Sequence, residues 1–491
     1  MSLSGGDSVR RNALLSFVAL AVPAVFTLCL TLYLVRVLGP ESYGVFALAM
    51  AAGLLFLLPS DLGISQSTAR FVAEHRTRAA VAAVLSGALQ LKLISGVVVA
   101  VGMFALAPTI ASIYGEDDLV WPLRGMALAV LAQGLMVFWN TAFVALLRVA
   151  LSLRVVLCES VAEVAASVVL VMLGSGATGA AFGRAFGYGL AATVAGVLMY
   201  RLLGKQAVNV LHAAGGEVRR IARYASALFI VDGAYSAFLA VSPLIIGAFL
   251  TAREVGVYGA PFRLIYALTY VGLAVANGVA PRMAHGSDAP SARVFVMWLR
   301  YLLVVQTALS VAIFVYAEPM VDIVLGSDYS DALNVIRVLS VFVFLSGFAP
   351  LFALSINYVG EARKRIPVAI GALAMNIVLT VALVPMMGVT GAAIGVSAAM
   401  LVYTGGHFWL CKRAFDLPLS QLGKTAARCV VAAGAMAATA YLFDSADAGI
   451  VLLFAGATIA LGVFAVLLVV LGELSRRERA IIIGWATRNG R

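Results

Sequence analysis

Charged residues are scarce in this chain. Of its 491 residues, 12% are charged and 63% are hydrophobic, and the mean hydropathy is +1.03. A water-soluble fold has no means of burying so much apolar surface. The composition therefore excludes a soluble globular protein and indicates a protein that resides in a lipid bilayer.

Cysteine and histidine are also rare. The four cysteines lie in or beside apolar stretches without paired external positions, and the four histidines are scattered along the chain. This distribution favours neither a disulfide framework nor a metal site. The chain also lacks a GxxxxGK nucleotide-binding motif, so the sequence gives no support for direct drive by ATP, and we expect no cofactor.

The sequence contains many long apolar runs. About 20 helical residues cross the roughly 30 Å of hydrocarbon in a bilayer. The sequence therefore predicts an all-α polytopic membrane protein with about fourteen transmembrane helices. These spans begin near Ala13, Gly44, Ala80, Val120, Val155, Ala180, Tyr224, Tyr258, Trp298, Asp331, Pro367, Val389, Ala427 and Gly449.

The formal net charge of +11 is distributed unevenly between the two sides of the predicted bundle. When the connections are sorted by alternate side, one side holds only Arg36 and Arg253, and the other holds nearly all remaining Lys and Arg outside the spans. The positive-inside rule places the basic side in the cytoplasm. We therefore expect an even number of spans and two cytoplasmic termini, and we interpret the charge as a topology signal rather than a nucleic-acid site.

An internal repeat organises the chain. Residues 34–46 read LVRVLGPESYGVF, and residues 249–262 read FLTAREVGVYGAPF, so that a Tyr-Gly pair recurs after about 215 residues. GATGAAFG at residues 176–183 is likewise answered by GVTGAAIG at residues 388–395. Landmarks repeated in the same order indicate a duplication.

The duplication predicts three parts. Residues 1–223 form a first lobe of six spans, residues 224–426 form an equivalent second lobe, and residues 427–491 form two further spans with a basic tail.

The repeated motif also carries a family resemblance. Together with SDLGISQSTARFVAEH at residues 60–75, RVLGPESYGVFALAM resembles the polysaccharide flippase (Wzx-type) branch of the multidrug/oligosaccharidyl-lipid/polysaccharide (MOP) exporter superfamily. The resemblance covers nearly the whole chain. It implies two six-helix lobes around a central cavity that opens to one side of the membrane at a time.

The implied activity is transfer of polyprenyl-diphosphate-linked oligosaccharide from the cytoplasmic to the outer leaflet. This activity would place the chain in a prokaryotic cytoplasmic membrane and in lipopolysaccharide or exopolysaccharide synthesis. The implied partners are the lipid-linked glycan, membrane lipids and polysaccharide polymerase or assembly machinery, and we expect a monomer.

Cations within the predicted spans are the main candidates for binding cargo. A charge inside the hydrocarbon costs several kcal/mol unless it faces water or a partner. Guanidinium groups bind phosphate oxygens in a bidentate manner, so these cations predict a cavity that holds a diphosphate. For the arginines, which lie near the outer edge, snorkelling toward the headgroups is the alternative. The predicted substrate-binding cations are Lys92, Arg124, Arg184, Arg263 and Arg337.

Acidic residues within the spans are candidates for ion coupling. Glu159 and Glu163 are one helical turn apart and share a face. If that face meets Lys92, the three form a structural ion cluster, and otherwise they couple transport to an ion. Asp232 is either a proton carrier or a packing partner, and Asp61 either caps a helix end or takes part in coupling.

Prolines and glycines predict local helix geometry. Pro23 and Pro243 lie on the first and seventh spans, where bends would act as hinges, although many such prolines are merely tolerated. The pairs Gly183 with Gly187 and Gly391 with Gly395 have the spacing of close helix packing.

Two other functions remain to be distinguished from a glycan flippase. A cation-coupled exporter of small molecules or drugs would need an acidic or aromatic site, whereas the spans carry five cations against four acids. A membrane glycosyltransferase or polymerase would need a catalytic loop, and the predicted outer connections are short. We therefore expect an anionic cargo and no enzymatic activity.

Overall fold

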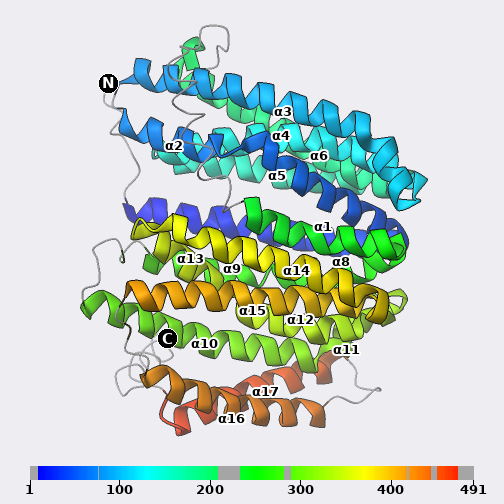
Figure 1. The fold of residues 1–491 in the computed structure, drawn as a ribbon, viewed down its shortest axis with the longest axis vertical. Helices are drawn as coiled ribbons and strands as arrows, with labels where there is room; N and C mark the ends of the chain where they lie inside the picture. Colours follow the sequence, from blue (N-terminus) through cyan, green and yellow to red (C-terminus); the bar gives the residue numbers. More distant parts are fainter. Residues whose placement is uncertain are drawn as a thin grey trace. The chain divides into compact units, whose positions relative to one another are not determined.

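The computed structural model describes residues 9–75, 77–207, 233–280, 283, 289–415, 417, 420–443 and 450–473. All regular secondary structure in these ranges is helical (Figure 1). The predicted all-α polytopic fold is confirmed.

Eleven helical stretches in the described ranges are long and apolar enough to cross a membrane. The stretch Val22–Asp61 is divided by a non-helical residue at Gly39, and Val149–Leu203 is divided near Gly174. Each therefore supplies two spans, and the shorter apolar helix Gly233–Phe249 supplies one more. Counted in this way, the described residues contain the fourteen predicted spans.

The helices of the first half follow one another with short connections. They are α1 (Val9–Asp61), α2 (Ile64–Glu74), α3 (Arg78–Tyr114), α4 (Val120–Ala145), α5 (Val149–Leu170) and α6 (Gly176–Leu203). After the helix Gly233–Phe249, the chain continues with α8 (Ala252–Tyr266), α9 (Thr269–Val279), α10 (Ala289–Val315), α11 (Ala317–Pro319), α12 (Leu333–Ser346), α13 (Ala349–Tyr358), α14 (Ile366–Met387), α15 (Val389–Ala414), α16 (Ser420–Leu442) and α17 (Ile450–Val470).

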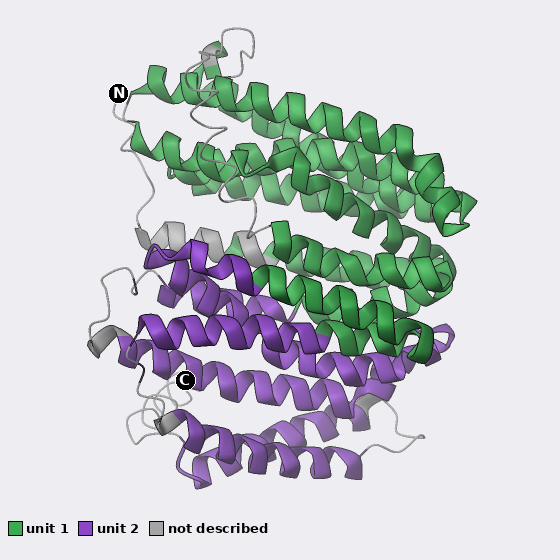
Figure 2. Cartoon of the chain, in the orientation of Figure 1, with its two compact units in different colours: residues 1–267, 369–396 green, residues 268–368, 397–491 purple. Residues whose placement is uncertain are grey.

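The chain forms two compact units (Figure 2). Unit 1 contains residues 1–267 and 369–396, and unit 2 contains residues 268–368 and 397–491. Helix packing, rather than the order of the repeat, defines these units. The predicted lobe boundaries after residues 223 and 426 stay a prediction.

Close contacts between small residues hold the helices of unit 1 together. A Cβ atom added to Gly183 would lie 2.5 Å from the Ser167 backbone, and one added to Gly187 would lie 2.7 Å from the Glu163 backbone. Side chains are excluded at these two positions, so α5 and α6 approach closely. Gly395 is equally close to Thr380 between α15 and α14, and the predicted packing role of these glycines is confirmed.

A backbone break interrupts the second span. Leu62 has φ 46° and Gly63 has φ 78°, both in the left-handed region, and they separate α1 from α2. A leucine in this conformation is rare, because its Cβ crowds the backbone. The break places the polar side chains around Asp61 within the apolar bundle of unit 1.

The last two helices are attached to the rest of unit 2 by a buried carboxylate. Glu473, just after α17, accepts from the Thr425 hydroxyl at 2.7 Å and from the Arg428 guanidinium at 2.9 Å, both on α16. Arg300 of α10 lies 3.2 Å from the same carboxylate. Since Glu473 is buried, this network links α10, α16 and α17.

Candidate functional site

The two copies of the repeated motif contact each other in unit 1. A Cβ on Gly44 would lie 1.7 Å from the Ala252 carbonyl oxygen, and a Cβ on Gly256 would lie 1.8 Å from the Pro40 carbonyl oxygen. Figure 1 shows the corresponding helices, α1 and α8, side by side. The contact is reciprocal, so the backbones meet with no space for a side chain.

This contact also fixes the register of the repeat. It pairs Gly44 with Gly256, 212 positions later, rather than with Gly259 as the Tyr-Gly pairs had indicated. The same interval relates Gly183 to Gly395, which both allow close helix packing. The glycine contacts in these elements therefore repeat at one interval of 212 positions. The second tyrosine lies three residues beyond the position that this interval predicts.

A cavity of about 190 Å³ lies beside this contact. Arg263 of α8 forms part of its wall, with Tyr43 and Met50 of α1 and Pro243 of the helix Gly233–Phe249. Arg263 Nε donates to Thr31 Oγ1 at 3.1 Å, and Nη1 donates to Met50 Sδ at 3.4 Å. Both acceptors are neutral, and no carboxylate of the described ranges forms a salt bridge with this guanidinium.

Arg184 of α6, by contrast, is neutralised. Its Nη1 donates to Glu163 Oε1 at 2.6 Å, and its Nη2 donates to Tyr188 Oη at 3.0 Å. Glu159 is also buried, accepts from Ser160 Oγ at 3.0 Å and lies one helical turn before Glu163 on α5. The cluster therefore contains two carboxyl groups for one guanidinium.

Lys92 forms a different ion pair. Its Nζ lies 2.5 Å from Asp61 Oδ1 and 3.3 Å from the Ser60 carbonyl oxygen, and the lysine is only 1% exposed. The predicted cluster of Lys92 with Glu159 and Glu163 is therefore wrong, because helix packing pairs Lys92 with Asp61 and Glu163 with Arg184. Asp61 ends α1 and accepts from Ser65 Oγ at 2.5 Å, which ties the end of α1 to the start of α2.

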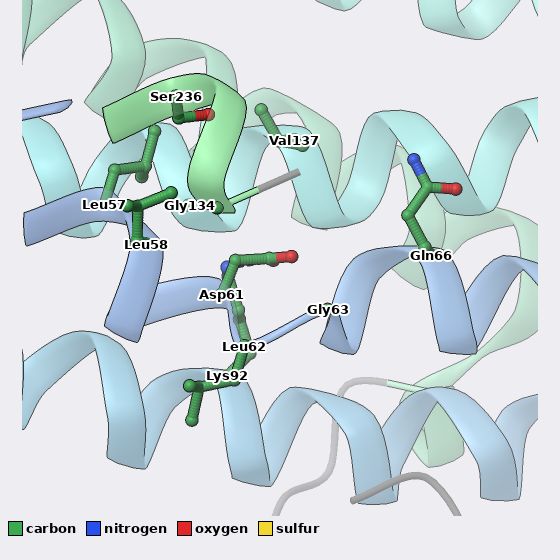
Figure 3. A pocket seen from close by; sticks show the side chains of 11 residues that line it. Leu57, Leu58, Asp61, Leu62, Gly63, Gln66, Lys92, Gly134, Val137 and Ser236 are labelled. Atoms are coloured by element: carbon green, nitrogen blue, oxygen red, sulfur yellow. Dashed lines mark hydrogen bonds and ion pairs between the residues drawn. The ribbon is translucent and has the colours of Figure 1, made fainter. Parts of the chain in front are cut away.

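The Lys92–Asp61 pair borders a second cavity of unit 1, of about 200 Å³ (Figure 3). In the figure, Asp61 comes from the end of α1, Gln66 from α2 and Lys92 from α3. A broken span, a buried cation and an acid therefore meet at one place.

The remaining predicted residues lie apart from these cavities or outside the described ranges. Arg124 of α4 stacks on Phe104 and Trp121, at 4.9 and 4.8 Å from the ring centroids. Arg337 belongs to α12 of unit 2 and is half-buried. Asp232 lies outside the described residues, and α1 remains helical at Pro23.

Comparison with protein families agrees with this geometry. A family model described as "Polysaccharide biosynthesis protein" matches residues 33–334, which is more than half of the chain. The chain belongs to this family of polysaccharide biosynthesis proteins. No curated protein matches the chain.

Solved structures similar to this polysaccharide biosynthesis protein come from the MOP superfamily. The lipid II flippase MurJ in an inward closed conformation matches with a TM-score of 0.72 and 13% identity, over 91% of this chain and 97% of MurJ. An inward-facing multidrug resistance MATE family transporter matches at 0.64 with 17% identity, over 81% of this chain and 98% of that one. A MOP superfamily transporter from Pyrococcus furiosus matches at 0.57 with 17% identity, over 84% and 97%.

These comparisons confirm the predicted fold. The chain is a multi-pass membrane protein with the fold of these transporters and of this flippase.

Sequence reasoning missed several polar contacts of this polysaccharide biosynthesis protein. In unit 2, Arg365 lies between two predicted spans on the basic side, yet it is only 6% exposed. It donates to Asn357 Oδ1 at 2.8 Å, His407 Nε2 at 3.1 Å and Tyr403 Oη at 3.4 Å. Nothing in the local sequence distinguishes it from the exposed Arg363 and Lys364 beside it.

The wall of the Arg263 cavity was partly visible in the sequence. Tyr43 belongs to the repeated motif, which was singled out for its recurrence, whereas Thr31 and Met50 carry no signal in an apolar run. In chemical terms, the described part of unit 1 presents a cavity-lining guanidinium with neutral acceptors, a pair of acids beside Arg184 and an ion pair at a helix break.

Proposed function

We propose that the chain is a flippase for polyprenyl-diphosphate-linked oligosaccharide. It moves this lipid from the cytoplasmic to the outer leaflet of a prokaryotic cytoplasmic membrane by alternating access, as a monomer. The membrane-embedded product then passes to the polymerase or assembly machinery for a surface polysaccharide.

The observation that carries this proposal is the environment of Arg263. A charged side chain within a membrane span normally has an oppositely charged partner or faces water, because desolvation of a lone charge costs several kcal/mol. Arg263 lines a cavity and has only a hydroxyl and a thioether as acceptors. Its charge is therefore available to an anionic group, and a planar guanidinium matches the oxygen geometry of a diphosphate.

The reciprocal glycine contact supports alternating access. The positive-inside rule puts Gly44 and Gly256 at the outer ends of their spans. Their contact would close the Arg263 cavity on the outer side, and separation of α1 from α8 would open it. Because small residues meet backbone to backbone, little apolar interdigitation opposes that separation.

The acid pair Glu159 and Glu163 is the proposed coupling site within this function. The pair has two carboxyl groups beside one cation, and Arg184 holds one of the two carboxylates in place. Proton binding and release at this pair would bias α5 and α6 between two arrangements. A reconstituted protein should respond to an imposed pH gradient, and Glu159→Gln should abolish that response. Equal responses of both proteins would leave Asp232 and Asp61 as coupling candidates.

Export of cationic drugs is the alternative activity on this fold. Tyr43, Phe262 and Tyr266 line the same cavity and could stack on an organic cation. Arg263 in their midst would repel that cargo, so the cavity favours an anion.

Replacement of Arg263 tests the proposed function. We expect Arg263→Ala to reduce export of lipid-linked glycan about 10- to 100-fold, since hydrogen bonds to charged groups contribute roughly 1.5–3 kcal/mol. The measurement is accumulation of lipid-linked glycan in the inner leaflet of cells whose own copy of the gene is deleted. Arg154→Ala, at an exposed arginine of α5, is the matched control. Full export by Arg263→Ala at normal membrane abundance would overturn the proposal.

Cysteine labelling tests the direction of transport. In a protein with Cys29 replaced by serine, single cysteines at Glu41 and Ser327 should react with an impermeant thiol reagent in intact cells. A cysteine at Arg363 should react only after the membrane is permeabilised. The reverse pattern would invert the topology and the direction with it.

A further inference from the structure

The second cavity of unit 1 has polar groups that its ion pair does not use. Lys92 Nζ donates to Asp61 Oδ1 and to the Ser60 carbonyl oxygen, and an ammonium group has three N–H donors. Asp61 Oδ1 accepts both bonds assigned to this carboxylate, so within the described ranges Oδ2 has no protein donor. One donor and one acceptor are therefore left side by side.

A buried hydroxyl adds to this set. Ser60 Oγ is buried and has no hydrogen-bond partner within the described ranges. A Cβ placed on Gly134, which lines the cavity, would lie 3.2 Å from Ser60 Oγ and 3.2 Å from Lys92 Nζ. The absence of a side chain at Gly134 therefore leaves space beside these two groups. The exposed amide of Gln66 completes the polar wall.

The charge of this cavity decides what it can bind. Asp61 and Lys92 cancel, so neither a free anion nor a free cation is favoured over its opposite. Adjacent hydrogen-bond donors and acceptors without net charge suit neighbouring hydroxyl groups, each of which both donates and accepts. A sugar unit presents such hydroxyls, whereas a diphosphate or a metal ion does not.

The position of the cavity fits a ligand that also reaches Arg263. Met50, which accepts from Arg263, and Asp61 lie on one uninterrupted segment of α1, eleven residues apart. At 1.5 Å per residue the two sites are about 16 Å apart along the helix. Leu54 lines the first cavity and Leu57 lines the second, and the two residues are about one helical turn apart on this segment.

We propose that this second cavity, lined by Asp61, Gln66, Lys92 and Gly134 beside the buried Ser60, is a glycan subsite. It binds the hydroxyl groups of a sugar unit while Arg263 binds the diphosphate of the same molecule. The inference rests on the proposed function, because it takes the ligand of the Arg263 cavity to be a glycan lipid. It assigns selection of the glycan to the break between α1 and α2.

Measuring the binding of two lipids tests the glycan subsite separately from the diphosphate site. The full chain, purified in detergent, is titrated with undecaprenyl diphosphate, which has no sugar, and with the lipid-linked glycan extracted from cells lacking the chain. Gly134→Ala fills the space beside Lys92 and Ser60 without removing a polar group. We expect this variant to bind the glycan lipid about tenfold more weakly, as loss of one or two hydrogen bonds predicts, and undecaprenyl diphosphate unchanged.

Matched variants keep the result interpretable. Gly102→Ala adds the same methyl group where nothing lies within 4 Å, and it should bind both lipids as the parent does. Gln66→Ala, at an exposed side chain, should weaken binding of the glycan lipid alone. This second variant guards against a folding defect in Gly134→Ala. Arg263→Ala should weaken binding of both lipids.

The outcomes distinguish the two proposals. The subsite is wrong and the proposed function stands if Arg263→Ala weakens binding of both lipids while Gly134→Ala and Gln66→Ala leave both affinities unchanged. Equal weakening of the binding of both lipids by Gly134→Ala would also overturn the subsite. If Arg263→Ala leaves both affinities unchanged, the proposed function fails. If Asp61→Asn abolishes a sodium or proton dependence of binding but keeps the preference for the glycan lipid, the cavity is an ion site instead.

Discussion

The two halves of the internal repeat share backbone geometry but differ in the charges of their spans. Gly176 and Gly388 both have positive φ, and Gly183 and Gly395 both allow close helix packing. In the first half, the spans contain the ion pairs Lys92–Asp61 and Arg184–Glu163. At the positions 212 residues later, the second half has only apolar side chains, namely Val304, Leu273, Val396 and Met375.

This difference separates what the fold needs from what the first half has acquired. Glycines at helix contacts occur in both halves, because the packing of any such pair of helices excludes a side chain there. The ion pairs Lys92–Asp61 and Arg184–Glu163 have no charged counterparts at the equivalent positions of the second half, so the fold of a half does not require charges at these positions. Charges retained at the cost of desolvation are functional candidates by default.

The largest expected effect comes from disrupting the glycine contact between the two copies of the repeated motif. Gly44→Ala and Gly256→Ala each place a methyl group within 2 Å of a carbonyl oxygen, so α1 and α8 must separate. We expect export to fall more than tenfold in either variant, with similar losses because the contact is reciprocal. Gly189→Ala, where nothing lies within 4 Å, is the control for export and membrane abundance. Normal export by one of the two variants would contradict the reciprocity.

A smaller effect comes from making the first half resemble the second. Arg184→Val alone leaves Glu163 buried without its cation, and we expect a loss of about 3–5 kcal/mol in the free energy of unfolding. The double variant Glu163→Met with Arg184→Val copies the second half, and it should recover most of that loss. Thermal unfolding in detergent measures both. A double variant no more stable than Arg184→Val would show that the pair is required by the fold.

The same double variant sharpens the functional side of the comparison. It should remain folded and lose its response to a pH gradient, because the proposed coupling pair is no longer present. A double variant that retains the full gradient response would remove this pair from the coupling mechanism.

The smallest expected effect concerns the acids at the outer ends of the first repeat. Burial and the neighbouring Asp118, Glu41 and Asp117 raise the pKa of Glu116, which lies between two spans. A carboxyl group with a raised pKa favours the folded state while protonated, and that stability is lost as pH rises through its folded pKa. Glu116→Gln should therefore raise the melting temperature at pH 7 by about one degree, and have no effect near pH 3. The acid of the second motif, Glu254, instead caps α8 through Thr251, and Glu254→Gln should not stabilise the protein.

The sequence by itself determined the membrane class, the fourteen spans and the duplication. Each of these depends on local composition or on recurrence along the chain: apolar runs set the spans, and matching glycines mark the repeat. It also identified which charges lie within spans, since a hydropathy pattern locates Lys92, Glu163 and Arg184 without reference to neighbours.

Only the tertiary structure decided which of those charges meet. Glu163 was predicted to face Lys92, but its partner is Arg184, 21 residues along, while Lys92 pairs with Asp61, 31 residues before it. Arg263 differs from Lys92 and Arg184 because the acceptors of its hydrogen bonds, Thr31 and Met50, are neutral. The physical reason is that helical periodicity fixes the face on which a side chain lies, whereas its partner depends on which helix packs against that face and at what height, and this is set by contacts between residues far apart in the sequence.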